Sequence, residues 1–480
     1  MAVLPDTPAR NSGDHPETTK TIFQLILQEI PLYIKNRKEL VSHGLIKDRE
    51  TIIDIIEHAL ARADPYKATL NLVHLEGDIL HIGDLRFDLP ERGNIYILGA
   101  GKATFRVAKA LEEILGERIA DGVIIVKEGQ PDTLKRVKVR EASHPLPDER
   151  GFLAAKEMKT LAGMARKGDI VFCAFSGGSS ALAPLPLAGI TLNDKRMINE
   201  LLLYSGASIR EINAVRKHLS DIKGGNLALS IFPAEIINLT ISDVIDDPLD
   251  YITDLTVPDT STFADAIQVL QKYDLMDRIS EPAREHLLRA DPEKETPKDS
   301  GDNLVHTFIV VKSNTAGEAA SSIASEMGLA SMILTSALEG ESAEASRVFT
   351  DTAATIRTHQ RPLAAPCALI ASGETTVTMP GTGGKGGPNQ EFALGAALQL
   401  GGKGGLVIAA IDTDGTDGPT EIAGGIVDCS TIERAGEKRL DVLESLLSHD
   451  SSTILRELGD AVITGHTGTN VNDLIVMLIS

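Results

Sequence analysis

Short apolar runs recur along most of the chain, and each ends in glycine, serine or aspartate. One of the first, NIYILGAGKA from Asn94, leads into TFRVAKALEEILG, which has helical periodicity. Similar runs follow at GVIIVKEG, DIVFCAFSGGSSAL and AEIINLTISDV, and after about residue 300 at HTFIVVKSN, LASMILTS, CALIASGE, GLVIAAIDTDG and DLIVMLI. Strands that alternate with helices predict an α/β fold with parallel sheets, which bind ligands at the carboxyl ends of their strands.

The length of 480 residues favours two domains. We expect a disordered N-terminus over residues 1–20, a first domain over 21–290 that begins with helices up to residue 62, and a second domain over 291–480. The charged, proline-containing segment 281–303 has the composition of a linker or surface excursion. The final strand could instead return to the first sheet.

The composition of the chain limits the classes of molecule that it could bind. Apolar residues make up 42% of the chain and charged residues 24%, as in ordinary globular proteins, and the net charge of −21 disfavours nucleic acids and anionic membranes. We find no signal-peptide pattern and no apolar run of about 18 residues, so we expect no membrane partner and a cytoplasmic protein. A homodimer held by the first 50 residues is a further expectation. The three scattered cysteines predict reduced thiols.

The turn GAGKATF places Gly99, Gly101 and Lys102 between a strand and a helix. Thr104 stands where a dinucleotide fingerprint has its third glycine, and the chain has no P-loop motif, so the evidence for NAD is weak. A lysine at a helix N-terminus favours contact with a phosphate or carboxylate. The similar turn SGGSSAL, residues 176–182, fits either anion binding or a tight structural turn.

A basic cluster and an acidic cluster follow. NAVRKHLSDIKGG, residues 213–225, brings Arg216, Lys217, His218 and Lys223 into a region with few other cations, which favours an anionic ligand. Arg216 and Lys223 would share one face if the segment were helical. ISDVIDDP contains three aspartates after a strand, which could bind Mg²⁺ or act as a general base, whereas turns and helix caps would explain only one of them.

The loop IDTDGTDG, residues 411–418, contains three aspartates. It fails as a calcium loop because Ala423 stands where the twelfth-position glutamate is needed. It imitates a phosphatase nucleophile motif, but too little chain follows to supply the other groups of such a site. The glycine-rich loop 371–398, with Lys385, Asn389 and Gln390, suits a polyphosphate, and a surface lid is the alternative.

Together these motifs resemble the glycerate 2-kinase family, whose C-terminal region is known as the MOFRL domain. The matching blocks run from about residue 50 to the end and are GAGKA, SHPLPDERG, FSGGSSAL, NAVRKHLSDIKGG, SDVIDDP, TVPDTSTFADA, GGKGGPNQEFAL, DTDGTDGPTEIAGGIVD and TGTNVNDL. The resemblance implies two Rossmann-like domains, with mostly parallel sheets, that face a central cleft. It also implies transfer of the γ-phosphoryl group of ATP, with Mg²⁺, to the 2-hydroxyl of D-glycerate.

The resemblance identifies Lys102 and Asp243 as catalytic residues. The other expected site residues are Ser176, Gly177, Gly178, Ser179, Arg216 and Lys217 for substrate, Gly99, Gly101, Glu374, Lys385, Gly386, Gly387, Asn389, Gln390, Thr469 and Asn470 for nucleotide, and Asp246, Asp247, Asp414 and Asp417 for metal.

The chain departs from the family at Ile245 and at residues 253–255, where small residues are usual, and at Pro388, where many members have arginine. Two alternatives therefore stay open. One is a hydroxypyruvate reductase, which the incomplete glycine fingerprint and the position of Asp121 disfavour. The other is a glycerate-binding protein that has lost turnover.

Overall fold

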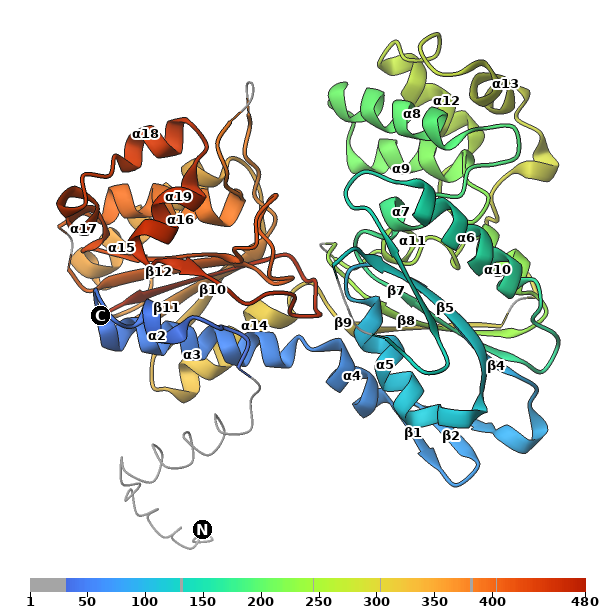
Figure 1. The fold of residues 1–480 in the computed structure, drawn as a ribbon, viewed down its shortest axis with the longest axis horizontal. Coiled ribbons are helices and arrows are strands. Elements are labelled where there is room, and N and C mark those ends of the chain that lie inside the picture. Colours follow the sequence, from blue (N-terminus) through green and yellow to red (C-terminus); the bar gives the residue numbers. More distant parts are fainter. Residues whose placement is uncertain (1–31, 130–132, 245, 303, 380–382, 403) are drawn as a thin grey trace, which may run out of the picture.

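The computed structural model describes residues 32–129, 133–244, 246–302, 304–379, 383–402 and 404–480, and these form two α/β domains (Figure 1). The predicted disordered N-terminus, the helical pattern before residue 32 and the departure at residue 245 lie outside the described residues. None of the described helices combines the length and the apolar character that crossing a membrane requires.

The first sheet has six strands, all parallel, in the order β6-β5-β4-β7-β8-β9. They are β4 (Ile95–Ala100), β5 (Ile119–Lys127), β6 (Lys138–Ala142), β7 (Ile170–Phe175), β8 (Glu235–Ile241) and β9 (Val305–Val311). β4, β7 and β8 are buried throughout, which explains their continuous apolar runs. β9 pairs with β8, so the first sheet extends beyond the expected boundary at residue 290.

Helices cover both faces of this sheet. α4 (Pro65–Leu72) and α5 (Thr104–Leu115) lie on one face, and α6 (Glu149–Ala162) and α10 (Asn226–Ile231) on the other. A separate three-stranded antiparallel sheet, β1 (Val73–Glu76), β2 (Ile79–Ile82) and β3 (Leu85–Asp88), precedes β4.

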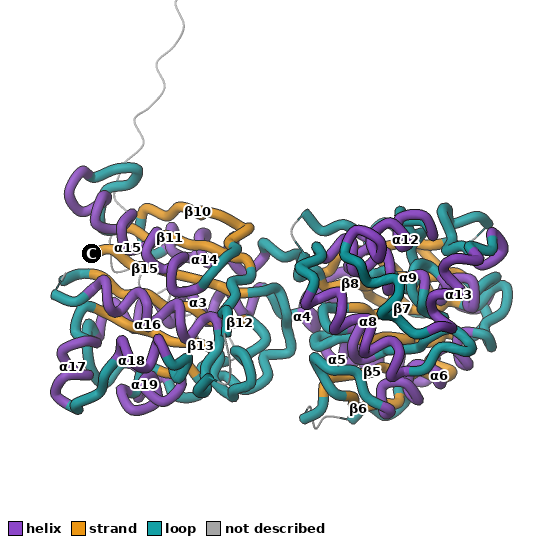
Figure 2. Tube along the Cα trace, turned by 90° about the horizontal axis from the view of Figure 1, so that it is seen from above, coloured by secondary structure: helices purple, strands orange, loops and turns teal. Residues whose placement is uncertain are grey.

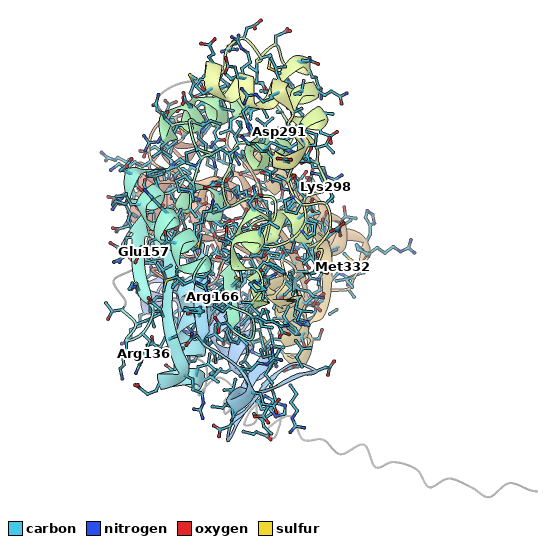
Figure 3. All side chains as sticks on the ribbon, turned by 90° about the vertical axis from the view of Figure 1, so that its right-hand side faces the viewer. Arg136, Glu157, Arg166, Asp291, Lys298 and Met332 are labelled. Atoms are coloured by element: carbon cyan, nitrogen blue, oxygen red, sulfur yellow. The ribbon has the colours of Figure 1, made fainter. Side chains whose placement is uncertain are left out.

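A helical layer extends the first domain beyond α6. It consists of α8 (Leu192–Tyr204), α9 (Ile209–His218), α12 (Phe263–Lys272) and α13 (Glu281–Arg289), which share one hydrophobic cluster. The short helices α7 (Ser179–Leu182) and α11 (Leu249–Ile252) lie between this layer and the sheet (Figure 1). In Figure 3, Asp291 lies at the end of the domain formed by this layer, and Arg136 lies toward the opposite end. The expected linker 281–303 thus contains a packed helix, because Ala283 and Leu287 are buried in the cluster.

The second sheet has the order β10-β11-β15-β12-β13-β14 and is mixed. Its strands are β10 (Ala330–Leu338), β11 (Cys367–Gly373), β12 (Leu406–Asp412), β13 (Gly424–Asp428), β14 (Ala461–Val462) and β15 (Asp473–Ile479). The strands β10, β11 and β12, which helices connect, run in the same direction as predicted. β13 and β15 run the opposite way, because no helix separates β12 from β13 or β14 from β15. The final strand lies in this second sheet.

The two faces of the second sheet carry different helices. α3 (Ile46–Arg62) and α14 (Thr315–Glu326) pack on one face, near the short α2 (Arg37–Leu40). The helices on the other side are α15 (Ser342–His359), α16 (Pro388–Leu400), α17 (Thr431–Glu437), α18 (Val442–Leu447) and α19 (Ser451–Leu458). Figure 2 shows the two domains side by side.

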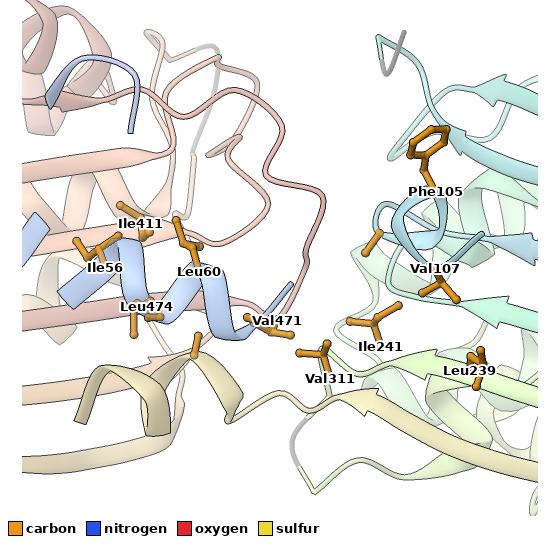
Figure 4. Close-up of a cluster of buried hydrophobic side chains, with 14 of the residues drawn as sticks. Ile56, Leu60, Phe105, Val107, Leu239, Ile241, Val311, Ile411, Val471 and Leu474 are labelled. Atoms are coloured by element: carbon orange, nitrogen blue, oxygen red, sulfur yellow. The ribbon is translucent and has the colours of Figure 1, made fainter. Parts of the chain in front are cut away.

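The position of α3 differs from the expected division, which placed it in the first domain. Its apolar stripe, with Ile56 and Leu60, packs beside Ile411 and Leu474 of the second sheet (Figure 4). The buried guanidinium of Arg49 also pairs with Asp428 at 2.6 Å and Asp460 at 2.8 Å. Sequence proximity to the first domain therefore did not predict where this helix packs.

One hydrophobic cluster joins the two domains. Val471, in the loop before β15, lies opposite Ile241 and Val311 at the ends of β8 and β9 (Figure 4). This contact places the carboxyl ends of the first sheet's strands against the loops of the second domain.

Candidate active site

A polar cavity of about 410 Å³ lies where the two domains meet. Its size is within the range of small-molecule sites. The lining residues come from both domains and are Lys102, His144, Gly178, Asp243, Glu374, Thr375, Pro388, Asp412, Asp417, Gly418, Asn470, Asn472 and Asp473.

Two turns of the first domain form one wall of the cavity. The turn after β4 and the turn after β7 are joined by hydrogen bonds, in which the Lys102 amide donates to the Gly177 carbonyl and the Ala103 amide to the Ser176 hydroxyl. A Cβ atom at Gly101 would lie 2.1 Å from Oγ of Ser176. Gly101 therefore allows the two turns to pack closely, and the side chain of Ser176 is used in the same packing.

The ammonium group of Lys102 contacts the second domain. Its Nζ lies 2.8 Å from Oδ2 of Asp414, whose other oxygen accepts hydrogen bonds from the amide and hydroxyl of Thr416. Burial opposes the charge of Lys102, but Asp414 and Asp412 raise the pKa of the lysine overall. The same lysine lowers the pKa of Asp414. Lys102 is thus a fixed cation at the cavity.

Asp243 faces the same cavity from the end of β8. Its Oδ2 accepts a hydrogen bond of 2.9 Å from Nδ2 of Asn470, and its backbone carbonyl accepts one of 2.5 Å from Asn472. Burial, followed by the charge of Glu374, raises the pKa of Asp243 to about 6. A Cβ atom at Gly177 would lie only 1.7 Å from Oδ2, so only glycine leaves room for this carboxylate.

Two further carboxylates, neither of them among the predicted metal ligands, lie side by side where β12 ends and β15 begins. Asp412 and Asp473 are paired residues on the adjacent strands β12 and β15, and both line the cavity. Burial raises the pKa of Asp473 to about 8, and burial with the charge of Asp414 raises that of Asp412. Asp473 accepts hydrogen bonds from Asn389 at 2.6 Å and from the Thr375 amide at 3.2 Å. The cavity therefore holds more carboxyl groups than the single charge of Lys102 can stabilise in ionised form, which is why their pKa values rise.

Asp417 has a structural role that its predicted role as a metal ligand did not include. Its carboxylate accepts hydrogen bonds from the amides and side chains of Asn389 and Gln390 at the N-terminus of α16. A carboxylate at a helix N-terminus satisfies otherwise unpaired N–H groups. These contacts occupy Asp417, Asn389 and Gln390 in holding the helix beside the cavity.

Several predicted site residues lie elsewhere. Lys217 is buried in the helical layer and pairs with Asp259 at 3.0 Å, and Arg216 contacts Asn199 of α8. Neither residue lines the cavity. Asp246 and Asp247 also lie outside the lining, as does Asp414, which pairs with Lys102. α9 ends at His218, so Lys223 is not on the same helix as Arg216.

The remaining predicted nucleotide contacts are divided. Glu374 lines the cavity and Pro388 begins α16 there, whereas Lys385 is an exposed residue whose amide donates to Asp450. Gly387 packs closely on Asp417, and residues 380–382 of this loop lie outside the described part of the chain. Gly99, Gly386 and Thr469 are not among the lining residues, and neither is Ser179, which was predicted to bind substrate.

His144 is a lining residue that sequence reasoning missed, although it belongs to the SHPLPDERG block. Its ring lies beside Gly178. Burial, followed by the charge of Lys102, lowers the pKa of His144 to about 4. The imidazole is therefore neutral at physiological pH and can accept or donate a hydrogen bond in the cavity.

The fold and the cavity define a class of protein. Two α/β domains bring a lysine, a carboxylate of raised pKa and a pair of neighbouring carboxyl groups to one cleft, the arrangement of an enzyme that carries out acid–base or metal-assisted chemistry on a small molecule.

Comparison with known proteins specifies this class. Residues 51–288 match a family described as a domain of unknown function (DUF4147), and residues 367–473 match the MOFRL family. The chain is 42% identical to the glycerate 2-kinase of Pyrococcus horikoshii, over 90% of this chain and 97% of the relative. It is 37% identical to a glycerate kinase of Thermotoga maritima of known crystal structure, with a TM-score of 0.78, over 90% of this chain and 100% of that chain. A protein of Agrobacterium vitis, provisionally named as a hydroxypyruvate reductase, is 37% identical over 93% of this chain and 98% of the relative.

The chain belongs to the glycerate 2-kinase family. This confirms the family resemblance and the two-domain α/β fold read from the sequence.

Proposed function

We propose that this protein transfers the γ-phosphoryl group of ATP to the 2-hydroxyl of D-glycerate. The observation that carries the proposal is the meeting of Lys102 and Asp243 in one interdomain cavity, in a chain whose relatives are named as glycerate kinases. Phosphoryl transfer depends mainly on cations around the phosphates and on the alignment of the attacking group. The cavity contains a side chain suited to each task.

Lys102 supplies the fixed positive charge. It is held by Asp414 at 2.8 Å from the opposite domain, so its ammonium group is oriented before any ligand enters. A preorganised cation stabilises the charge that develops on a transferring phosphoryl group without reorganising during the reaction.

Asp243 is suited to orient and deprotonate the attacking hydroxyl. With a pKa of about 6 it is ionised at neutral pH and remains a stronger base than an ordinary aspartate. The hydrogen bond from Asn470 fixes one of its oxygens. The other oxygen is the acceptor that we assign to the 2-hydroxyl proton.

The carboxylates also fit a magnesium ion. Asp412 and Asp473 are hard oxygen donors on adjacent strands, and no lysine or arginine forms an ion pair with either of them among the described residues. A bound Mg²⁺ would neutralise negative charge on the phosphates of ATP. This pair replaces Asp246, Asp247 and Asp417 as our proposed ligands, because Asp246 and Asp247 do not line the cavity and the carboxylate of Asp417 holds α16.

A hydroxypyruvate reductase is disfavoured by the turn after β4. Gly99 and Gly101 are crowded by Ala174 and Ser176, so the backbone there is packed against protein. Asp121 lies within β5 and pairs with Lys138 at 3.1 Å, whereas a ribose-binding carboxylate follows the end of its strand.

The experiment that separates these readings measures two activities of the purified chain. One sample receives ATP, Mg²⁺ and D-glycerate, and ADP release is recorded; the other receives NADH and hydroxypyruvate, and NADH oxidation is recorded. ADP release that requires D-glycerate supports the proposal. NADH oxidation without ADP release would contradict it, and tight glycerate binding with neither activity would favour a protein that has lost turnover.

A further inference from the structure

Three basic side chains of the helical layer, Lys195, Arg216 and Lys223, lie close enough to repel one another, and none of them lines the cavity described above. Lys195 lies on α8, Arg216 on α9 and Lys223 in the turn that follows α9. Lys195 and Lys223 are only 3% and 2% exposed, and Arg216 is partly buried. Buried charges are normally paired, because removing an ion from water is costly.

Among the described residues, Asp254 is the carboxylate that opposes these three cations. Asp254 lies 2.7 Å from Nζ of Lys223, and both groups are buried. The charges of Lys223 and Asp254 therefore balance each other, which leaves Lys195 and Arg216 without an opposite charge from the described residues. In the part of the chain that the structure describes, no carboxylate forms an ion pair with Lys195 or Arg216.

The other two cations have neutral surroundings. Nε of Arg216 donates to Oδ1 of Asn199 on α8 at 2.8 Å. Lys195 lies four residues before Asn199 and therefore on the same face of α8. Its buried Nζ has no hydrogen-bond partner in the described structure. A buried ammonium group has three hydrogen-bond donors, and such groups are normally satisfied by an acceptor. An anionic ligand would supply one.

The electrostatics agree with this geometry. Burial, followed by the charges of Lys223 and Arg216, lowers the pKa of Lys195 to about 7. Burial also lowers the pKa of Arg216 and of Lys223. A bound anion would remove this mutual repulsion.

The helices around the cluster connect to the interdomain cavity. α7, α8, α9 and α11 lie together above the carboxyl ends of the first sheet's strands (Figure 1). Gly178, which lines the interdomain cavity, caps α7, and Asp254 follows α11. The turn after β7 thus leads from the cavity into the helices that surround the cluster.

We propose that Lys195, Arg216 and Lys223 form a second oxyanion site, which binds the carboxylate or phosphate group of a small molecule beside Asp254. Asp254 acts as an internal competitor that occupies Lys223 and limits the affinity for that group. If the bound group is the carboxylate of D-glycerate, the proposal rests on the proposed kinase function. If the bound group is free phosphate, the proposal is independent of that function.

The test titrates the full chain with inorganic phosphate and, separately, with D-glycerate by isothermal calorimetry. Lys195→Met should weaken binding of at least one of these anions by about tenfold or more, because a charged hydrogen-bond donor is lost. Lys272→Met is the matched control, since Lys272 is an exposed lysine of the same layer, and it should leave binding unchanged. Asp254→Asn should tighten binding, which tests the site even if Lys195→Met folds poorly.

Kinetics then identify the source of the anion. A rise of about tenfold in the KM for D-glycerate, with kcat and the KM for ATP little changed, assigns the site to the substrate carboxylate. Lys195-dependent phosphate binding with an unchanged glycerate KM assigns it to free phosphate. Absence of kinase activity in the wild type would contradict the proposed function while leaving the phosphate titration as a test of the site. Anion binding that is indifferent to both Lys195→Met and Asp254→Asn would overturn the proposal.

Discussion

Replacing Arg49 with methionine tests how α3 is held to the second domain. Arg49 and its partner Asp428 both have fully buried side chains, and the guanidinium also contacts Asp460 and the Leu40 carbonyl. Breaking a buried ion pair on one side costs about 3–5 kcal/mol. Asp428 keeps donors from Leu45 and Ser430, and Asp460 keeps the guanidinium of another arginine, so we expect the lower end, about 3 kcal/mol.

The assay is urea denaturation followed by far-UV circular dichroism, because the chain contains no tryptophan. Arg140→Met is the control: Arg140 forms an ion pair with Glu157 in which the side chains are 46% and 34% exposed, and its loss should cost less than about 1 kcal/mol. An Arg49→Met variant within about 1 kcal/mol of the wild type would refute the reasoning.

The effect of Arg49→Met on the stability of the protein should also depend on pH. Burial alone would raise the pKa of Asp428, but Arg49 and the surrounding donors hold it at about 2, below its unfolded value of about 4. Asp428 therefore stabilises the fold above about pH 4, and that contribution is lost as the pH falls toward about 2. The difference in stability between wild type and Arg49→Met should shrink over this range. A constant difference would contradict the assigned coupling.

Three further predictions concern the cavity. Lys102→Met should lower kcat at least ~100-fold, measured as glycerate-dependent ADP release, while the exposed Lys156→Met should not change it; near wild-type rates would exclude Lys102 from the mechanism. Asp243→Asn should lower kcat at least ~100-fold, and the wild-type rate should decline below about pH 6, where Asp243 becomes protonated; a decline centred near pH 4 would contradict its role. Gly177→Ala should displace the Asp243 carboxylate and reduce kcat by about tenfold or more, with far-UV dichroism as the folding control; an unimpaired rate would show that the loop adapts.

The sequence predicted the local elements of the fold better than their assembly. Continuous apolar runs identified β4, β7 and β8, because strands buried on both faces need no polar alternation. The directions of β13 and β15 depend on connections without helices, and the position of α3 depends on the partners of Arg49. Partners distant in the sequence cannot be read from local periodicity.

The site was predicted to a similar extent. Lys102, Asp243 and Asn470 were assigned from strand-end positions and the family resemblance, and the structure brings them together. Asp412 and Asp473 were not predicted as metal ligands, because their proximity depends on the register of β12 against β15, and Asp473 lies 61 residues after Asp412 in the chain. The charge of Lys217 is used in an ion pair within the helical layer. A count of basic residues in the sequence cannot distinguish such a lysine from one that binds a ligand.

The most direct test of the proposed activity is phosphorus NMR of the product formed from D-glycerate, ATP and Mg²⁺ by the purified chain. The account predicts 2-phosphoglycerate and ADP in equal amounts, and no such product with the Asp243→Asn variant on the same timescale. Formation of 3-phosphoglycerate, or no transfer to glycerate at all, would contradict it.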